Sequence, residues 1–403
     1  MIARPKVALV RCPSYEMETV EAALQRSLNA VGGMQAFISP GQVVALKPNL
    51  VRAMTPDQAA TTHPMLVAAV IRAVRSVGAE ALVVDSPGGP FTPGVLKALY
   101  RKTGMDWAVR EAGGTLNLDV RSVQVPVDDG RALHRIDMAA AIVEADAVIN
   151  LPKLKTHNLT GLTLSVKNLF GVVPGTLKIA YHGKMQETER FCQGMLDILI
   201  CTKPVLNIMD AVVAMEGNGP SGGEPRPANA LIVGADALAV DAVAAALVGL
   251  DPTDVATTAA AVRRGLTTGR LEDLELLGDA LETLRVKGFR LGTNLSFDPG
   301  LLPGFLRQLL PKRDADEMER GRVRSWSSRW LTQQLLAYPE AGPTCTGCGY
   351  CARNCPVDAI TIVNGRAEMD LKRCIRCYCC HELCPELAID LKRSWLARRI
   401  GGA

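Results

Sequence analysis

The chain has 403 residues, which is enough for two or three domains with buried cores of their own. Hydrophobic residues make up 48% of it and charged residues 21%, a balance that excludes wholesale disorder and a fibrous architecture. The 45 Lys and Arg against 41 Asp and Glu give a net charge of +4, too near neutrality for a nucleic-acid-binding protein.

No export or membrane-spanning segment is predicted. The first apolar run, Val7 to Val10, is shorter than the hydrophobic region of a signal peptide. The longest apolar stretch, residues 231–250, contains Asp236 and Asp241, each of which would cost about 2.5–3.5 kcal/mol in a bilayer. This stretch is therefore predicted to be a buried strand followed by a helix, and the protein is expected in the reducing cytoplasm.

Residues 1–285 alternate short β-branched runs with longer segments of helical spacing, the pattern of an α/β sheet. The predicted strands are Lys6–Val10, Val43–Leu46, Ala81–Val84, Ala147–Asn150, Val205–Met209 and Leu231–Val233. The predicted helices are Glu16–Ala30, Pro64–Val77, Val95–Arg101, Met138–Glu144 and Val240–Val248. Residues 120–134 predict an antiparallel hairpin added to that sheet. The expected fold class is α/β, with a mixed, mainly parallel sheet and flanking helices.

Polar side chains follow several of these strands, at the sheet edge where open α/β folds bind their ligands. The candidate substrate-binding residues are Lys47, Asn49, Asp85, Asn168, His182, Asp210, Glu216 and Asn218. The candidate catalytic residues are Lys153, Lys155, Lys167 and His157. The lysines favour a small anionic molecule, a carboxylate or a phosphate, and His157 is the expected proton carrier.

Plainer interpretations of these residues stay open. Each lysine alone is more simply read as decorating a loop. His157, His182, Asp210 and Glu216 also have the chemistry to hold one metal ion, so an additional metal ion or unidentified cofactor in this cleft is an alternative. Residues 217–222 match G-x-G-x-x-G, but Pro225 and Pro227 exclude the helix that a dinucleotide-binding loop requires.

Residues 286–343 predict a helical, basic connector, and the Pro- and Gly-containing stretch at 339–343 predicts a domain boundary. A basic tail is expected at 393–403. Three tryptophans in these two segments, Trp326, Trp330 and Trp395, lie among arginines. That composition is compatible with an acidic protein partner or a peripheral membrane contact, although such stretches are more often solvated helix faces.

Nine of the 12 cysteines lie between Cys345 and Cys384. Two segments there share the spacing C-x2-C-x2-C-x3-C-P: one begins at Cys345 and the other at Cys374. A zinc site needs neither the third cysteine nor the Cys-Pro pair, so zinc is the weaker alternative. The ninth cysteine, Cys379, is expected to be a packed or free thiol, and the three distant cysteines, Cys12, Cys192 and Cys201, core residues.

This block resembles bacterial dicluster ferredoxins, in which the cysteine before the proline ligates the other cluster. The resemblance implies a small C-terminal α+β ferredoxin-like domain at 344–392 with two 4Fe-4S clusters. The ligands implied for the first cluster are Cys345, Cys348, Cys351 and Cys384. Those implied for the second are Cys374, Cys377, Cys380 and Cys355.

Residues 5–250 resemble the domain of unknown function 362 family. The motifs that carry this resemblance are Lys47-Pro48-Asn49, Thr62-His63-Pro64, Asp85-Ser86-Pro87, residues 151–157, residues 166–171 and residues 215–220. The resemblance implies the architecture, including a C-terminal ferredoxin module, more than a reaction. A fainter similarity to the nickel-pincer lactate racemase type of α/β protein is an analogy only.

The leading functional hypothesis is an iron–sulfur oxidoreductase that passes electrons to a small anionic substrate or bound cofactor in the N-terminal cleft. One alternative is a non-catalytic electron-transfer or assembly subunit that docks a redox partner protein. Another is a non-redox isomerase or transferase with structural clusters.

Overall fold

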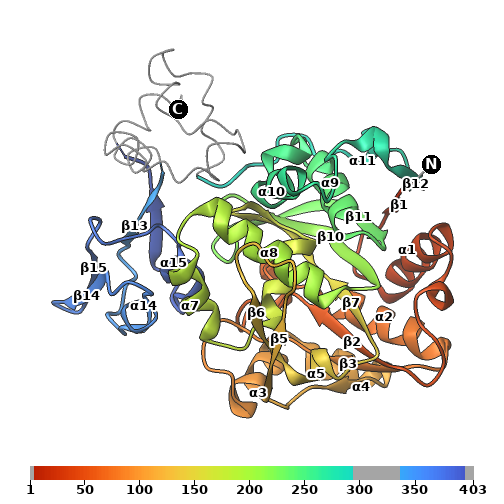
Figure 1. Cartoon of the computed structure of the whole chain (residues 1–403), viewed down its shortest axis with the longest axis horizontal. Coiled ribbons are helices and arrows are strands. Elements are labelled where there is room, and N and C mark those ends of the chain that lie inside the picture. Colours follow the sequence, from red (N-terminus) through yellow and green to blue (C-terminus); the bar gives the residue numbers. More distant parts are fainter. Residues whose placement is uncertain (1–3, 294–335, 395–403) are drawn as a thin grey trace. The chain divides into compact units, whose positions relative to one another are not determined.

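The computed structural model describes residues 4–293 and 336–394 (Figure 1). The chain divides into two compact units, Met1–Arg290 and Leu291–Ala403. Most of the predicted connector and basic tail, with Trp326, Trp330 and Trp395, lies outside the described residues.

A ten-stranded mixed sheet forms the centre of the first unit. Its main path runs in the order β12 (Glu275–Gly278), β1 (Lys6–Arg11), β11 (Glu224–Gly234), β10 (Leu206–Glu216), β7 (Ala147–Leu151), β2 (Val43–Pro48), β3 (Glu80–Val83) and β4 (Thr115–Leu116). Two further strands extend from β10: β8 (Lys153–His157) pairs with it in parallel, and β9 (Gly161–Thr163) pairs antiparallel with β8. Since β11 is antiparallel to both β1 and β10 while β2 is parallel to β3 and β7, the predicted mixed, mainly parallel sheet is confirmed.

Helices accompany this sheet along the chain (Figure 1). They are α1 (Met17–Ala30), α2 (Pro64–Ser76), α3 (Pro93–Lys102), α4 (Met105–Ala112), α5 (Ala140–Val143), α6 (Ser165–Asn168), α7 (Leu177–Lys184), α8 (Thr188–Thr202), α9 (Ala237–Leu247), α10 (Ala256–Arg264) and α11 (Leu281–Leu284). Short 3-10 turns occupy Met34–Ala36, Pro56–Gln58, Leu169–Val172, Pro252–Asp254 and Leu271–Asp273.

The central strands β1 and β2 bury residues on both of their faces. In β2, Val44 and Leu46 belong to a core that includes α1, α2 and α4, while Ala45 between them belongs to a core that includes α8 and α10. The same alternation in β1 places Val7 and Leu9 against α9. Successive strand residues point to opposite faces, so an apolar run of this kind is what a sheet covered on both sides requires.

The apolar stretch at 231–250 is divided between the end of β11 and α9, as predicted. Asp236 caps α9 by accepting hydrogen bonds from the backbone N–H groups of Leu238 and Ala239. Asp241 accepts from the N–H groups of Ser165 and Val166 at the start of α6. Among the described residues, no helix has the length and apolar character needed to cross a membrane.

Two predictions about the middle of the chain are wrong in detail. The hairpin is formed by β5 (Ser122–Pro126) and β6 (Arg135–Ala139), and these strands make a separate two-stranded sheet instead of joining the main one. Its second strand extends into the predicted helix Met138–Glu144, so that only α5 is helical there. The burial of Ile136 and Met138 on one face of β6 explains why this segment is extended.

The second unit is a small α+β structure. Its elements are β13 (Tyr338–Ala341), α14 (Tyr350–Arg353), β14 (Ile360–Val363), β15 (Arg366–Met369), α15 (Cys379–Leu383) and β16 (Ile389–Lys392). β13 pairs antiparallel with β16, and β14 with β15. The first of these strands precedes residue 344, so the folded module includes residues that the sequence assigned to the connector.

Candidate functional site

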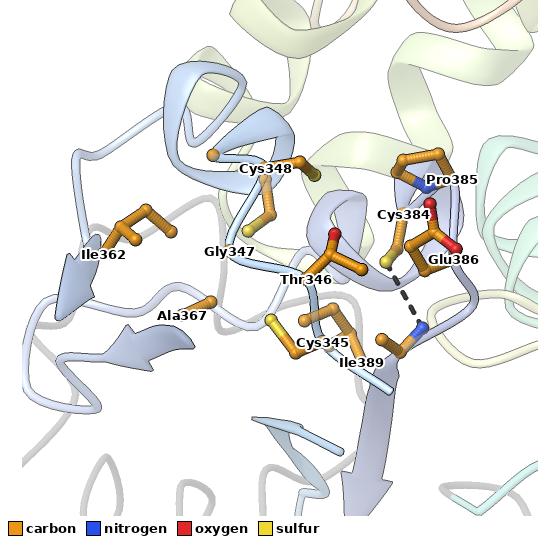
Figure 2. Close-up of a pocket in the computed structure, with 13 residues that line it drawn as sticks. Cys345, Thr346, Gly347, Cys348, Ile362, Ala367, Cys384, Pro385, Glu386 and Ile389 are labelled. Atoms are coloured by element: carbon orange, nitrogen blue, oxygen red, sulfur yellow. Dashed lines mark hydrogen bonds between the residues drawn. The ribbon is translucent and has the colours of Figure 1, made fainter. Parts of the chain in front are cut away.

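Four cysteines line one cavity of about 290 Å³ in the second unit (Figure 2). They are the set implied for the first cluster: Cys345, Cys348, Cys351 and Cys384. Three come from the turn leading into α14 and from α14 itself, and Cys384 follows α15 in the other half of the module. The loop and helix of one half therefore form most of the cavity, and the second half completes it.

A second cavity of about 350 Å³ mirrors the first. Its lining includes Cys374, Cys377, Cys380 and Cys355, the set implied for the second cluster, together with Cys379. Here the second half of the module supplies three of the cysteines, and the first half contributes the fourth, Cys355. Each cavity thus receives three cysteines from one half and one from the other half, as the duplicated spacing implies.

The two cysteines that precede prolines are held alike. The backbone N–H of Ala359 donates to Cys355 Sγ at 3.2 Å, and that of Ala388 donates to Cys384 Sγ at 3.3 Å (Figure 2). In each half the N–H comes from the residue four positions after the cysteine, and the residue before it, Asp358 or Leu387, has a left-handed backbone. N–H donors stabilise a thiolate sulfur and belong to the features that tune iron–sulfur potentials.

The cysteines of each set line a cavity, and their side chains do not converge on one central point. Among the described residues, no group of three or more His, Cys, Asp or Glu side chains converges as a single metal ion requires. A four-iron cube needs one thiolate at each iron, so its ligands stand around a cavity. The chemistry and placement of these eight cysteines therefore fit two 4Fe-4S clusters better than two zinc ions.

Cys379 contacts the second set without occupying a motif position. Its thiol is buried and forms a hydrogen bond with Cys377, which lowers the pKa of Cys377 and raises that of Cys379 well above its usual range. Cys379 is thus a packed thiol that favours the thiolate form of its neighbour, in line with the expectation from the sequence.

In the first unit, Lys47 and Asp85 form a buried ion pair at the ends of β2 and β3. Lys47 Nζ lies 2.7 Å from Asp85 Oδ1 and donates to the carbonyl of Pro48 at 2.6 Å. Asp85 also accepts from the N–H groups of Leu50 and Ser86. Burial lowers the pKa of Lys47 and the nearby carboxylate opposes that change. A Cβ on Gly171 would lie 2.4 Å from Lys47 Nζ and 2.5 Å from Asp85 Oδ1, so a larger residue there would displace this pair.

Lys178 belongs to the same neighbourhood, although the sequence did not single it out. Its ammonium donates to Val173 O at 2.6 Å, Ser86 Oγ at 3.1 Å and Pro87 O at 3.3 Å. Burial lowers the pKa of Lys178 to about 7; Asp85 opposes the change, and the charges of Lys47 and Lys167 reinforce it. The signal available in the sequence was its position in α7, shortly after the Val166–Gly171 motif.

Lys153 and Asp210 form a second buried pair, between β8 and β10. Lys153 Nζ lies 2.9 Å from Asp210 Oδ2 and 2.8 Å from the hydroxyl of Tyr15, which donates to Asp210 Oδ1 at 2.7 Å. The backbone N–H of His63 donates to the same carboxylate at 2.8 Å, and its ring stacks on Tyr15 at 3.6 Å. Burial lowers the pKa of His63 to about 4, so its ring is neutral at physiological pH.

Lys155 lies two residues along β8 and is linked to β2. Its ammonium donates to Asn49 Oδ1 at 3.0 Å and to the carbonyl of Ala60 at 2.6 Å. Thr62 joins the neighbouring strands, because its hydroxyl donates to Leu151 O and accepts from the N–H of Asn49. Asn168 completes this edge by donating to the carbonyl of Lys47 and to Asn150 Oδ1.

His157 ends β8 with its ring buried. Its Nδ1 accepts from the backbone N–H groups of Leu159 at 3.1 Å and Thr160 at 3.4 Å. This places the proton of the neutral ring on Nε2. The adjacent Thr156 accepts from Gly219 N, and Asn158 donates to Gly219 O, so the loop at 217–223 is fixed against β8.

Lys167 and His182 lie around a pair of aromatic rings. Lys167 Nζ is 4.9 Å from the ring centre of Phe170 and 5.7 Å from that of Phe191. His182 stacks on Phe191 at 4.5 Å. Both side chains therefore belong to the core beside α8 as well as to the polar region, and Lys167 stays partly exposed.

Glu216 is placed apart from these groups. Its carboxylate accepts from Arg290 Nε at 2.9 Å and from the backbone N–H of Arg290 at 3.0 Å, while the neighbouring Asn218 is exposed. Asp210 is held by Lys153 and His182 by Phe191, so His157, His182, Asp210 and Glu216 do not converge on one ion within the described residues. These four residues therefore do not form a shared ligand set among the described residues, and a metal ion or cofactor in the cleft stays a prediction.

The structure thus places the candidate residues near β2, β3, β7, β8 and β10 in several hydrogen-bonded groups. Lys47, Lys153 and Lys155 are each only 1% exposed, and Asp85 and Asp210 are 2% or less. Their ammonium groups contact oxygen atoms of the chain itself. Lys167 and Lys178 are partly exposed residues, although the ammonium group of Lys178 is buried against three oxygen atoms of the chain. Whether these residues bind a substrate stays a prediction.

Known proteins share both the sheet-forming region and the cysteine module. The profile described as "Domain of unknown function (DUF362)" matches residues 44–246, and that of a 4Fe-4S dicluster domain matches residues 340–385. A thylakoid-associated protein of Synechocystis is 34% identical over 270 residues, which are 64% of this chain and 79% of that protein. One component of an ion-translocating oxidoreductase complex from Methanosarcina acetivorans is 40% identical over 60 residues, covering 15% of this chain and 22% of that component.

Two solved structures show weaker similarity. The lactate racemase apoprotein from Thermoanaerobacterium thermosaccharolyticum is 16% identical with a TM-score of 0.38, over 58% of this chain and 55% of that one. A Thermotoga maritima protein is 12% identical with a TM-score of 0.35, over 56% of each chain. Both TM-scores are below 0.5, a similarity too weak to assign a property of either structure to this chain. The profile match over half of the sequence and the Synechocystis relative place the chain in the family with the domain of unknown function DUF362, here joined to a 4Fe-4S dicluster domain.

Proposed function

We propose that this protein is an iron–sulfur oxidoreductase that moves electrons between a pair of 4Fe-4S clusters and a small anionic substrate bound beside Asp85. The clusters would supply one-electron redox chemistry in the second unit. The dicluster profile and the two cysteine-lined cavities support that half of the proposal.

The part of the proposal that concerns substrate binding depends on the balance of charges around Asp85. Its carboxylate raises the pKa of Lys178, whereas the charges of Lys47 and Lys167 lower it. One carboxylate among three ammonium groups leaves an excess of positive charge. Because Lys167 is partly exposed, an anion can approach this group of charges from solvent on its side.

Each residue then has a distinct task. Lys47 is already neutralised by Asp85 and holds that carboxylate in place. Lys167 and Lys178 bind the anion. Lys178 also carries a proton that it can give up near neutral pH, since burial lowers its pKa to about 7. The arriving anion favours the protonated ammonium, so binding and proton supply are coupled. His157 remains the second candidate for proton transfer.

The test begins with anaerobically purified protein. About eight irons per chain are expected, as two four-iron clusters require. The protein is reduced with dithionite, freed of excess reductant, and mixed with small carboxylates and phosphate monoesters while the visible cluster absorbance is followed. One class of compound should accelerate reoxidation in a saturable manner.

The variant Lys178→Gln should raise the half-saturating concentration of that compound at least tenfold with unchanged iron content. Lys97→Gln, which alters an exposed lysine in α3, should behave as the wild type. Absence of iron, or an unaltered response in Lys178→Gln, would contradict the proposal.

A second candidate function is that of an electron-transfer subunit in a larger assembly. It is favoured by the 60-residue similarity to a component of an ion-translocating oxidoreductase complex. Under this candidate, no small compound reoxidises the reduced protein, whereas a co-purified protein partner does so rapidly. The same absorbance experiment therefore separates the two functions.

A further inference from the structure

The two halves of the cysteine module repeat the same backbone with different residues. Between the first and second cysteines, Gly347 has φ +66° and its counterpart Arg376 has φ +56°. Directly after the second cysteine, Gly349 has φ +72° and its counterpart Tyr378 has φ +60°. Left-handed backbone favours glycine, so the second half places large side chains where the conformation disfavours them.

These two side chains converge on one atom. Arg376 Nη1 donates to the carbonyl of Ala337 at 3.1 Å, and the Tyr378 hydroxyl donates to the same oxygen at 2.9 Å. This carbonyl directly precedes β13, so both side chains tie the first strand of the module to the second cysteine loop.

The Arg376 guanidinium carries a buried charge that one carbonyl does not neutralise. The residue is 8% exposed, and its Nε has no hydrogen-bond acceptor in the described part of the chain. Within residues 4–293 and 336–394, no carboxylate forms an ion pair with it. A buried cation without a counter-charge is costly, so an anionic group nearby is expected to compensate it.

Candidates for that anionic group are the cysteines of the second cavity. Arg376 lies in the loop between Cys374 and Cys377, and its two neighbours in the chain, Ile375 and Cys377, both line that cavity. Its charge therefore belongs to the loop that surrounds the cavity. Cys374 lines the cavity with Cys355, Cys377 and Cys380.

We propose that Arg376 is a built-in counter-charge for the second 4Fe-4S cluster and raises its reduction potential. The inference rests on the proposed function, which supplies the cluster. Four thiolates give such a cluster a net negative charge, and reduction adds one electron without forming or breaking a bond. A buried cation stabilises the more negative, reduced form and so raises the potential.

Glu382 is an acidic group that opposes this effect, because it lies in α15 two residues after Cys380, a cysteine of the same cavity. It is less buried than Arg376, so solvent screens its charge more strongly. The two residues therefore predict opposite variants: loss of the Arg376 charge lowers the potential of the second cluster, and loss of the Glu382 charge raises it.

The chain offers a matched control at Arg373, one residue before Cys374. Arg373 is exposed and donates to the carbonyl of Val357 at 3.0 Å. Arg373→Gln removes the same charge at a neighbouring position, but from solvent. The equivalent first-half position cannot serve, because a Cβ on Gly347 would lie 2.3 Å from the carbonyl oxygen of Gly365.

The experiment is a redox titration of the full-length, iron-loaded protein, followed by electron paramagnetic resonance. In Arg376→Gln, one of the two midpoints should fall and the other should stay. At a fixed potential the reduced-to-oxidised ratio of that cluster should drop at least tenfold, which is 59 mV for one electron. Arg376→Lys should restore most of the ratio, Glu382→Gln should raise it, and Arg373→Gln should change it less than threefold.

Two unchanged midpoints in Arg376→Gln with full iron content would overturn the inference, as would an equal shift in Arg373→Gln. If Arg376→Gln loses iron, the charge-conserving Arg376→Lys is expected to retain it, and its failure to do so would also overturn the inference. Wild-type protein without iron would instead refute the proposed function itself.

Discussion

The two units of this molecule balance their buried polar groups differently. In the first unit, the buried lysine ammonium groups contact carboxylates, carbonyls or amides of the same chain, as Lys153 does with Asp210 and Tyr15. In the second unit, the cysteines face two cavities, and the buried Arg376 has no carboxylate to pair with among the described residues. The buried lysines of the first unit thus have partners within the polypeptide, although positive charge is in excess beside Asp85, whereas the cysteines of the second unit line two cavities.

The largest effect is expected when one half of the module loses the cysteine that it contributes to the cavity of the other half. Cys384→Ser and Cys355→Ser should each lower the iron content by about half or more, because each cavity receives one cysteine from the other half. The second unit should then lose its protection from proteolysis while the first unit keeps it. The measurements are iron and sulfide content and limited proteolysis.

Cys379→Ser is the matched control for those variants, since Cys379 lies outside the repeated spacing. It should retain both the iron and the protection. If Cys379→Ser loses as much iron as Cys384→Ser, the assignment of ligands by the repeat is wrong.

The next largest effect is expected when a buried lysine of the first unit loses its counter-charge. Asp210→Asn leaves Lys153 buried without its counter-charge, so the free energy of unfolding should fall by about 3–5 kcal/mol. Denaturant titration measures this change. Adding Lys153→Met should recover part of the loss.

The exposed pair of Arg72 and Glu21 is the comparison for Asp210, and Glu21→Gln should cost less than about 1 kcal/mol. Equal losses in Asp210→Asn and Glu21→Gln would show that burial does not decide the strength of these pairs.

A smaller effect depends on pH. The pKa of Lys178 is about 7 in the folded protein, below its usual value of 10.5, so the unfolded chain binds more protons between these values. The free energy of unfolding should therefore rise with pH across that window, by at most about 1.4 kcal/mol per pH unit from this group. Lys178→Met should lack this slope, and Lys97→Met should keep it. A parallel pH profile in Lys178→Met would contradict the low pKa.

The smallest effect is expected at the surface. Arg26 is 57% exposed in its pair with Asp279, and Arg26→Ala should change the free energy of unfolding by less than about 1 kcal/mol. A loss comparable with that of Asp210→Asn would remove the distinction between buried and exposed pairs on which the other predictions depend.

The sequence predicted the main parallel strands well, because fully buried strands are continuous apolar runs. It missed β8 because Lys-Leu-Lys-Thr-His is polar by composition, although its period of two was visible and places Lys153 and Lys155 on one face. It also missed the second strand of the separate hairpin, where the burial of Ile136 and Met138 decides the conformation.

For the candidate sites, the spacing of the cysteines indicated which residues line the cavities, whereas the presence of lysines did not indicate what they contact. The repeat named the lining of both cavities because a tight loop fixes neighbouring thiols. The predicted lysines lie at the ends of neighbouring strands, but Tyr15 and Lys178 come from segments that no motif marked, and His63 was noted only as part of Thr62-His63-Pro64. Their roles depend on contacts across long sequence separations, such as the 195 residues between Tyr15 and Asp210.

Each half contributes one cysteine, Cys355 or Cys384, to the cavity of the other half. These two cysteines therefore affect when each set of four is complete during translation. The second cavity has all of its cysteines once Cys380 has been made, whereas the first waits for Cys384 although its other three were made earliest. Neither half offers a complete set of thiols while it is the only half synthesised. If these eight cysteines are the ligands, neither cluster can be completed before cysteines of both halves have been made.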